Sequence, residues 1–556
     1  MLELVQDHLT LLTVLVTAAA VLLALPSIAS YIREPRALFT KPRPDLFTPS
    51  GCYPFIGHQL KIWRRSDRQP ELWVEQQCER DRAGVTDPAK ACSDTAFGRR
   101  WISIRRPEEL EWVQRTNFKN YVKGPEQQWI MHELFGDGIF TSDGDLWVRQ
   151  RKATSRVFTN KSYRGIISQS ISGSLDVLDT VLAHYADSGA ELNLGQVFLS
   201  FTLDTFLEMA YSAQPGALAA ELDGKAVPFA KALQRAQVII SRRFGNPLWP
   251  LTEILTGDRF RVQADMKVVH AFADRIINER EKEFTAKLET GEQDGDDEEA
   301  DTMQSDLLSR FLAIRDEDGK AMSKEAVRDA TINLLLAGRD TTGGTLSWAI
   351  FHLLSYPPLI AHIRREAASL LSSEDDNKPG KVPFDRLKEA SCTLAYWYEA
   401  ARLHPAVPVN FWTALDDDQL PNGGPRVEKG DFVTWSDWAT QRSREFWGPN
   451  AGAFDPARWL DEDGKFNQES EFKLHSFNGG RRRCLGETLA TFEGVSVLLA
   501  LFSRYDLAFA PDYLASTEML QSELCADRTP RYGNGLTMPM LEPLRVVVSR
   551  RKEKEA

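Results

Sequence analysis

The sequence is poor in cysteine and histidine, and it lacks the motifs of several common enzyme classes. Six cysteines are scattered through 556 residues without a Cys-x-x-Cys pair, which argues against a disulfide framework and favours a reducing compartment for most of the chain. The nine histidines show no metal-ligand spacing, and no Gly-x-Ser-x-Gly motif occurs. Zinc-dependent chemistry and serine nucleophiles are therefore not expected.

The sequence also lacks an excess of positive charge, since acidic residues outnumber basic ones. The net charge is −12, and no basic tract interleaved with aromatic residues is present, so nucleic acid is not an expected partner. The sequence has no P-loop and no complete Gly-x-Gly-x-x-Gly motif, because Gly136-x-Gly138 and Gly533-x-Gly535 each lack the third glycine. Without a nicotinamide or flavin site, redox chemistry would need electrons from another protein.

One long apolar run is present, at the N-terminus. Residues 9–32 are mostly apolar, and at the helical rise they span roughly 36 Å, enough to cross a bilayer. Acidic residues precede the run and basic residues follow it. This asymmetry predicts a cytosolic main body. A cleaved signal peptide stays open as an alternative, because small residues such as Ser27 and Ser30 end the run.

Helical patterns dominate the rest of the chain from about residue 100, and few segments alternate like strands. These strand-like segments are 101–105, 431–435 and 544–548. The predicted fold class is mainly α with a small β-rich region. The predicted organisation is a luminal N-terminus (1–8), a transmembrane anchor (9–32), a proline-rich linker (33–57), one catalytic domain (58–550) and a charged tail (551–556).

The most informative segment is Phe477-Asn-Gly-Gly-Arg-Arg-Arg-Cys484-Leu-Gly486. Helix-forming residues follow it, so Cys484 is predicted at a helix N-terminus, where free N–H groups and the helix dipole stabilise a thiolate. A thiolate can ligate haem (heme) iron and favours O–O cleavage. Gly480 suits a tight turn, Gly486 lets a flat ring approach the backbone, and Phe477 can shield the sulfur. Arg482 can form a forked hydrogen bond with a haem propionate.

The segment around Cys484 resembles the signature of the cytochrome P450 family, Phe-x-x-Gly-x-Arg-x-Cys-x-Gly, at every fixed position. Ala490 and Glu493 extend the resemblance. It covers about residues 45–550, and it implies the cytochrome P450 fold with a haem held by Cys484. An isolated cysteine would more often be a small core residue, and that is the alternative interpretation.

A single long helix is predicted from Ser323 to Tyr356. Ser323 is a suitable N-cap, and Pro357-Pro358 stops the helix. Its centre is Ala337-Gly-Arg-Asp-Thr-Thr342, in which glycine, aspartate and threonine favour helices poorly. Such a cluster inside an apolar helix indicates that another group occupies the space beside it.

The resemblance assigns the chemistry of oxygen activation to this centre. Gly338 would make room for dioxygen, Thr341 would donate a hydrogen bond to the oxygen being activated, and Asp340 would connect the site to solvent protons. The alternative is that Thr341 only bonds back to a carbonyl one turn earlier. One branch of the family links its haem through a glutamate at the position of Ala337, so no such ester link is expected here.

The resemblance also assigns roles to two further motifs. Glu399 and Arg402 are neighbours on one helix face, and the family pattern makes them a buried ion pair with Arg458 as third partner. Trp147 and Arg151 also share a helix face. With Arg482 they would hold a propionate, whereas the alternative is a core tryptophan beside a solvated arginine.

The resemblance implies a haem-thiolate monooxygenase that inserts one atom of O2 into a C–H bond of a lipophilic substrate. Electrons would come from an NADPH-dependent flavoprotein reductase. An acidic surface of that reductase would contact Arg481, Arg483 and Lys473. The enzyme would be a single-pass protein of the endoplasmic reticulum membrane.

Four segments look like the plant and fungal branch that hydroxylates fatty acids and alkanes near the chain end. Residues 120–135 and 407–411 are candidates for the pocket wall, and no residue stands out as a carboxylate clamp. The four segments are Phe118-Lys-Asn-Tyr-Val-Lys-Gly-Pro125, Gly136-Asp-Gly-Ile-Phe140, Ala337-Gly-Arg-Asp-Thr-Thr342 and Arg402-Leu-His-Pro-Ala-Val-Pro408.

Two other functions stay open at this point. A haem-thiolate isomerase or dehydratase would need no reductase, although such enzymes tend to lose the acid–alcohol pair present here. A membrane-tethered haem sensor or electron carrier would need the thiolate but no oxygen-activating helix. Among monooxygenase substrates, a sterol or an aromatic secondary metabolite is the alternative to a fatty acid.

Overall fold

The computed structural model describes residues 43–552, apart from 54–55, 97–98, 156–157, 225–226, 291–306, 309–310, 312–321, 372–379, 521–524, 526 and 534; for 284–290 it describes the backbone only. The predicted N-terminus (1–8), the transmembrane anchor (9–32), about half of the linker (33–42 and 54–55 of 33–57) and residues 553–556 of the charged tail lie outside these residues. Within the described part, no single helix is long and apolar enough to cross a membrane. Only Lys324–Ser355 together with Pro357–Leu370 meets that criterion, as a pair bent by 107°.

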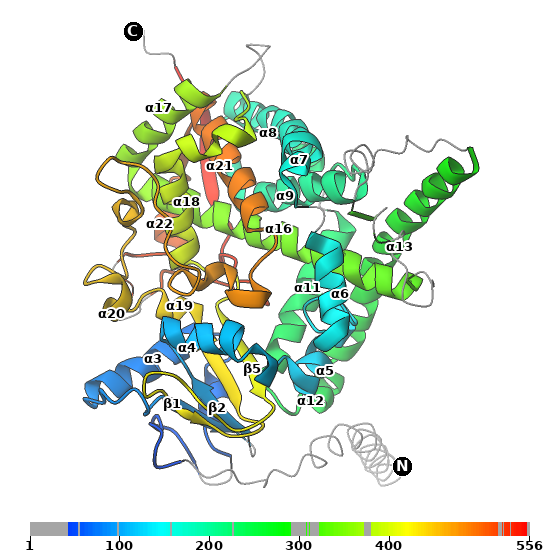
Figure 1. Ribbon diagram of the computed structural model, residues 1–556. Coiled ribbons are helices and arrows are strands. Elements are labelled where there is room, and N and C mark those ends of the chain that lie inside the picture. Colours follow the sequence, from blue (N-terminus) through cyan, green and yellow to red (C-terminus); the bar gives the residue numbers. More distant parts are fainter. Residues whose placement is uncertain are drawn as a thin grey trace, which may run out of the picture.

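The described chain is mainly helical, as predicted, with small sheets beside the helical body (Figure 1). The helices are α2 (Gln59–Arg64), α3 (Gln69–Arg82), α4 (Pro107–Glu111), α5 (Gly124–Phe135), α6 (Gly144–Ser155), α7 (Asn160–Ser162), α8 (Ser168–Ser188), α9 (Leu194–Tyr211), α10 (Ala217–Ala220), α11 (Pro228–Arg243), α12 (Trp249–Thr256), α13 (Asp258–Thr290), α16 (Lys324–Ser355), α17 (Ile360–Leu370), α18 (Ser391–Leu403), α19 (Asp437–Thr440), α20 (Arg444–Trp447), α21 (Glu487–Arg504) and α22 (Tyr513–Ser516).

The largest sheet has five strands in the order β1-β2-β8-β5-β3, and only the β2–β8 pair is parallel. A three-stranded sheet has the order β4-β10-β9, and β6 pairs with β7. The three predicted strand segments correspond to β2, β8 and β10, each shifted by one or two residues. The strands are β1 (Cys92–Ala96), β2 (Arg99–Ser103), β3 (Tyr121–Val122), β4 (Glu191–Asn193), β5 (Val409–Ala414), β6 (Asp418–Gln419), β7 (Arg426–Val427), β8 (Phe432–Ser436), β9 (Tyr505–Phe509) and β10 (Arg545–Arg550).

The central element is α16, and the prediction of one long helix is confirmed. The Ser323 hydroxyl accepts a hydrogen bond from the Ala326 N–H at 3.2 Å, which caps the first turn. The middle of the helix crosses α9 closely. A Cβ added at Gly338 would lie 2.3 Å from the Phe206 ring, so packing against α9 already requires glycine there.

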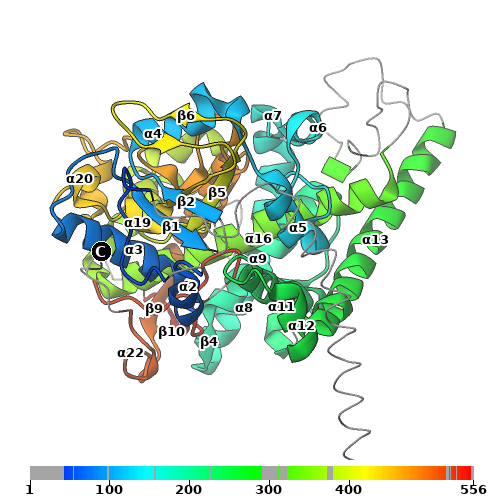
Figure 2. The same ribbon diagram turned by 90° about the horizontal axis from the view of Figure 1, so that it is seen from below.

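The helices and the five-stranded sheet occupy different sides of the molecule. Figure 2 shows α11, α12 and α13 on one side of the molecule and β1 and β2 on the other, and in Figure 1 they lie toward the right and the lower left, respectively. The loop that leads into α21 contains Cys484, and α21 packs against α16, α17 and α18. The fold therefore brings the predicted cysteine segment and the predicted oxygen-activating helix into one body.

Candidate functional site

The predicted turn before Cys484 is present. Gly480 has φ +58°, and a Cβ there would lie 2.3 Å from the carbonyl oxygen of Gln114, so only glycine fits. The Cys484 N–H donates to the Phe477 carbonyl at 2.8 Å, which closes the loop. Helix α21 begins at Glu487, three residues after the cysteine, so the sulfur lies beside a helix N-terminus as predicted.

The surroundings of the Cys484 sulfur change the acidity of its thiol. Its side chain has accessible surface although protein atoms enclose it, and this burial raises the pKa of the thiol to about 11. The Gly486 N–H, Arg151 and Arg483 act in the opposite direction. A thiol with this pKa gives up its proton to a metal ion more readily than to solvent.

The backbone beside the sulfur is open to a flat ligand. A Cβ added at Gly486 would meet only the Cys484 sulfur within 4 Å, at 3.9 Å. No other side chain therefore fills the position next to this glycine. The loop fits a planar macrocycle stacked over the backbone, which is the role predicted for Gly486.

Trp147, Arg151 and Arg482, predicted from separate motifs, lie together near the cysteine loop. The Arg482 guanidinium lies 4.4 Å from the centre of the Trp147 ring and donates to the Asp143 carboxylate at 2.7 Å. Arg151 donates to the backbone carbonyl of Arg483 at 2.7 Å. The structure thus gathers around the sulfur the groups expected to hold propionates.

Lys123 joins this cluster, and sequence reasoning missed it. Its ammonium donates to the Asn410 side-chain oxygen at 3.3 Å. Burial lowers the Lys123 pKa to about 7, helped by the charge of Arg482, while Asp143 opposes the shift. Burial likewise lowers the Arg482 pKa to about 10. The only sequence signal was the place of Lys123 in a segment that resembles the fatty-acid hydroxylase branch.

The charges of this cluster do not balance. When Lys123 is protonated, Lys123, Arg151 and Arg482 carry three positive charges, although the Lys123 pKa of about 7 leaves its ammonium only partly charged near neutral pH. Asp143 is the carboxylate that contacts this cluster. Unpaired charges in a low-dielectric site are unfavourable, so the cluster favours additional anions. A haem brings two propionates, and these would balance the excess positive charge and favour the protonated form of Lys123. The residues present therefore fit the cofactor.

The centre of α16 is less buried than the helical turns on either side of it. Ala337, Gly338, Asp340 and Thr341 are only partly buried, whereas the residues before and after them are mostly buried. The Thr341 hydroxyl donates to the Ala337 carbonyl at 2.7 Å, which is the back-bond that the alternative interpretation required. The dioxygen role of Gly338 and the hydrogen-bonding role of Thr341 stay predictions, since packing and this bond account for the geometry.

Asp340 is held by two side chains. Gln237 of α11 donates to one carboxylate oxygen at 2.6 Å, and Arg339 donates to the other at 2.6 Å. The predicted path from Asp340 to solvent protons is therefore covered by protein groups in this arrangement.

The predicted ion network is assembled and buried. Arg402 donates twice to the Glu399 carboxylate, at 2.7 and 2.8 Å, and Arg458 donates to the same carboxylate at 3.1 Å. Trp459, which sequence reasoning missed, adds an indole N–H at 2.9 Å. Neither Glu399 nor Arg402 has exposed surface. The network fixes α18 against the segment that contains Arg458.

A buried hydrogen-bond chain holds the loop ahead of the cysteine, and no sequence motif pointed to it. His475 bonds Asp437 at 2.7 Å and Gln114 at 2.9 Å through its two ring nitrogens. The Gln114 side-chain oxygen also accepts the Gly479 N–H at 2.9 Å. This chain links the loop to the five-stranded sheet side of the molecule.

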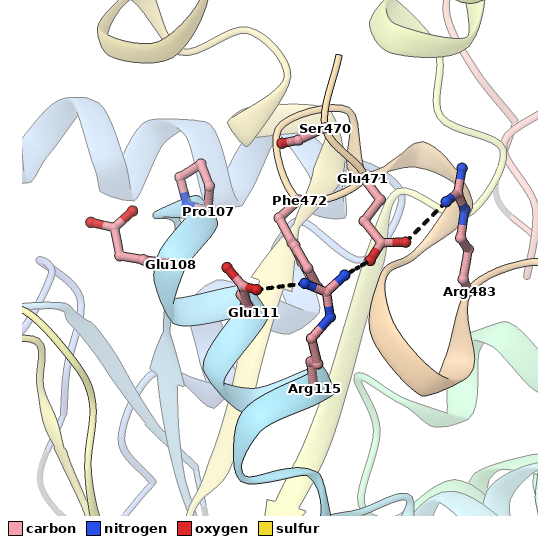
Figure 3. Close-up of a pocket in the computed structure, with 8 residues that line it drawn as sticks. All are labelled: Pro107, Glu108, Glu111, Arg115, Ser470, Glu471, Phe472 and Arg483. Atoms are coloured by element: carbon pink, nitrogen blue, oxygen red, sulfur yellow. Dashed lines mark hydrogen bonds and ion pairs between the residues drawn. The ribbon is translucent and has the colours of Figure 1, made fainter. Parts of the chain in front are cut away.

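The outer face of the cysteine loop forms a surface pocket of about 550 Å³ (Figure 3). Arg115 bridges Glu111 and Glu471, and Glu471 also bonds Arg483 at 3.2 Å. Lys473 is paired with Glu469 at 2.5 Å. Arg483 and Lys473, which we expected to meet an acidic partner, are thus neutralised by carboxylates of this chain.

Comparisons with known proteins agree with this site. The sequence profile "Cytochrome P450" matches residues 97–525. "Cytochrome P450 monooxygenase cyp1" of Mycosarcoma maydis is 36% identical over 92% of this chain and 77% of its own length. "Cytochrome P450 704B1" of Arabidopsis thaliana is 31% identical over 75% of this chain and 83% of its own. The crystal structure of the cytochrome P450DA heme domain has a TM-score of 0.69 at 21% identity, covering 91% and 98% of the two chains.

The profile spans the segments that contain Cys484, the centre of α16 and the Glu399 network, and the solved structure has the same fold. The chain therefore belongs to the cytochrome P450 family, as a monooxygenase with a haem-thiolate cofactor.

Proposed function

We propose that this enzyme hydroxylates a long-chain fatty acid or alkane at or near the chain end, with electrons from an NADPH-dependent flavoprotein reductase. The support is the likeness of four segments to the fatty-acid and alkane hydroxylase branch, together with the aromatic contacts of Phe411 in the predicted pocket wall. The haem held by Cys484 supplies dioxygen activation. Overall, RH, O2, two electrons and two protons give ROH and water.

An aromatic cluster in the predicted pocket wall carries this proposal. Phe411 of β5 contacts the rings of Trp101 at 4.7 Å and Phe432 at 5.3 Å, both from the same sheet. It also contacts Phe244, just beyond α11, at 5.9 Å. These rings join the sheet to α11 with apolar surface. Such a wall suits an alkyl chain, which makes no directional hydrogen bonds.

The residues of the centre have separate tasks in this reaction. Lys123, Arg151 and Arg482 bind and orient the cofactor through its carboxylates. Asp340 would relay protons toward the site, and Thr341 can turn its hydroxyl from the Ala337 carbonyl toward the oxygen site. Each proton transfer needs a donor within hydrogen-bond reach, and the two residues are adjacent on α16.

The proposal includes an anchor in the endoplasmic reticulum membrane with the catalytic body in the cytosol. Its support is the apolar run at 9–32 and the basic residues after it. Large apolar side chains are also exposed around α12, namely Leu248, Leu255 at 68% and Phe260 at 65%. Carbonate extraction and protease protection in microsomes test this point. Release of a shortened, soluble chain would instead support the signal-peptide alternative.

A substrate panel tests the main proposal. Purified enzyme is mixed with NADPH, a reductase, and fatty acids, alkanes, sterols or aromatic compounds, and the products are identified by mass spectrometry. We expect hydroxylation near the chain end of fatty acids or alkanes. Turnover of sterols or aromatic compounds alone would replace the substrate class. Product without NADPH would indicate an isomerase or dehydratase, and no NADPH consumption with any compound would indicate a sensor or carrier.

A further inference from the structure

The carboxylate of Asp340 is tied to a different helix by one buried amide. Gln237 is only 3% exposed, and its amide donates to Asp340 at 2.6 Å from α11, 103 residues earlier in the chain. Arg339 holds the second oxygen at 2.6 Å. A buried glutamine is uncommon unless its polar atoms are bonded, so this contact specifies the orientation of both side chains.

The same helix reaches the aromatic wall of the predicted substrate pocket. Phe244 follows the last residue of α11 and contacts Phe411 at 5.9 Å. Gln237 and Phe244 are separated by two helical turns, about 10 Å along the axis. At this end, Arg243 is fastened by Glu253 at 2.6 Å and by Glu133 at 2.8 Å. A packed helix moves as a rigid element, so displacement at one end reaches the other.

We propose that Gln237 is a positioning residue that couples α11, and thereby the substrate pocket, to proton delivery by Asp340. With α11 in the position that the structure shows, Gln237 holds the Asp340 carboxylate in one orientation. When α11 shifts, the amide moves away and Asp340 is free to turn. This inference depends on the monooxygenase activity and not on the substrate class.

The chemistry gives a direct measure of this coupling. Productive turnover converts RH, O2, two electrons and two protons into ROH and water. If protons arrive at the wrong place or time, the same two electrons and two protons leave with O2 as hydrogen peroxide. The share of NADPH electrons recovered as peroxide therefore reports on Asp340, and not simply on the amount of active enzyme.

The test compares Gln237→Leu, which keeps the volume but cannot donate, with Gln234→Leu on the exposed face of the same helix. Dodecanoic acid is the first substrate used. If the parent enzyme does not convert it, a compound from the panel that the parent enzyme does convert takes its place. For Gln237→Leu we expect a several-fold larger peroxide share and a larger solvent deuterium isotope effect on kcat. The KM for substrate and the spectrum of the reduced carbon monoxide complex should stay close to those of the parent. Equal peroxide shares in the two variants would overturn the proposal.

A second measurement needs no substrate. Thermal unfolding of the holoenzyme is compared for Gln237→Leu, Asp340→Ala and the double variant. If the two side chains interact, the Tm shift of the double variant is smaller than the sum of the single shifts. Additive shifts would overturn the contact itself. An inactive parent enzyme with a non-additive cycle would instead count against the proposed substrate class alone.

Discussion

The guanidinium of Arg482 donates a hydrogen bond of 2.7 Å to the carboxylate of Asp143, from the loop ahead of α21 to the residue before α6. Asp143 also accepts the backbone N–H groups of Lys123 and Gly124 at 3.0 Å each. One carboxylate thus fixes the chain on which Lys123 lies and the arginine ahead of the cysteine. This carboxylate therefore keeps the cationic residues Lys123 and Arg482 close together even without the carboxylates of a cofactor.

Replacing Lys123 with methionine should weaken haem retention. The change keeps most of the side-chain volume but removes one of the positive charges that a propionate would neutralise. We expect a faster loss of haem to apomyoglobin, measured by absorbance, while the fold stays intact by circular dichroism. Lys119→Met, on an exposed position of the same segment, is the control and should lose haem as the parent does.

Glu399→Ala should destabilise the protein severely. It leaves Arg402 buried without its partner, and breaking a buried ion pair costs on the order of 3–5 kcal/mol. We expect a lower denaturant midpoint and loss of haem during purification. Glu389→Ala removes the acid of the Arg386–Glu389 pair, which is exposed at 43% and 54%. This control should change stability little, and equal effects in the two variants would contradict a special role for burial.

Gly338→Ala separates packing from oxygen chemistry. The new methyl group would lie 2.3 Å from the Phe206 ring, so either the ring or the two helices must shift. Overpacking of this kind costs about 1–3 kcal/mol. Adding Phe206→Leu should restore the Tm. If the double variant regains stability and also full hydroxylation, packing alone explains Gly338; if activity stays lost, the role in oxygen access is supported.

Glu493 should make stability fall as pH rises. Burial raises the pKa of this carboxyl from 4.5 to about 8, so the folded protein keeps the proton more tightly than the unfolded chain. This contribution is complete below pH 4.5 and is lost as pH approaches 8, by at most about 1.4 kcal/mol per pH unit. Denaturant midpoints across this window should show the parent losing stability relative to Glu493→Gln. A constant difference between the two would refute the shift.

Cys484→Ala should abolish the spectrum of a haem-thiolate protein. The reduced parent under carbon monoxide is expected to show a strongly red-shifted absorption band, since an anionic sulfur would be the axial ligand. Cys392→Ala should keep this band. The assignment fails if the parent lacks the band, or if Cys484→Ala retains it together with full oxidation of substrate.

Local rules predicted much of the fold and the site. The cap at Ser323 and the glycine turn at Gly480 depend on neighbouring residues, so they follow from short segments of sequence. Family resemblance added the long-range pairing of Glu399 with Arg458, which no spacing rule contains.

Contacts between distant segments were not predictable in the same way. Lys123, Gln237 and His475 belong to no motif with a stated role, and each acts through a partner far away in the chain. Gly338 had a chemical role in the prediction, yet the neighbouring helix α9 gives it a steric one. The availability of a surface cation to a partner also depends on ion pairs within the fold. Arg483, for example, is paired with Glu471 and Glu487.

Arg402 bonds more than its acid partner, because it also donates to the backbone carbonyls of Gln441, Ala451 and Ala453. The polypeptide between 441 and 453 has little regular structure apart from α20, so this guanidinium supplies bonds that a strand ladder would give elsewhere. We expect residues 441–453 to become ordered only after α18 has formed and packed against the rest of the protein. The ordering of this stretch should thus come late in the folding pathway, and newly made chains would be most vulnerable to proteolysis there.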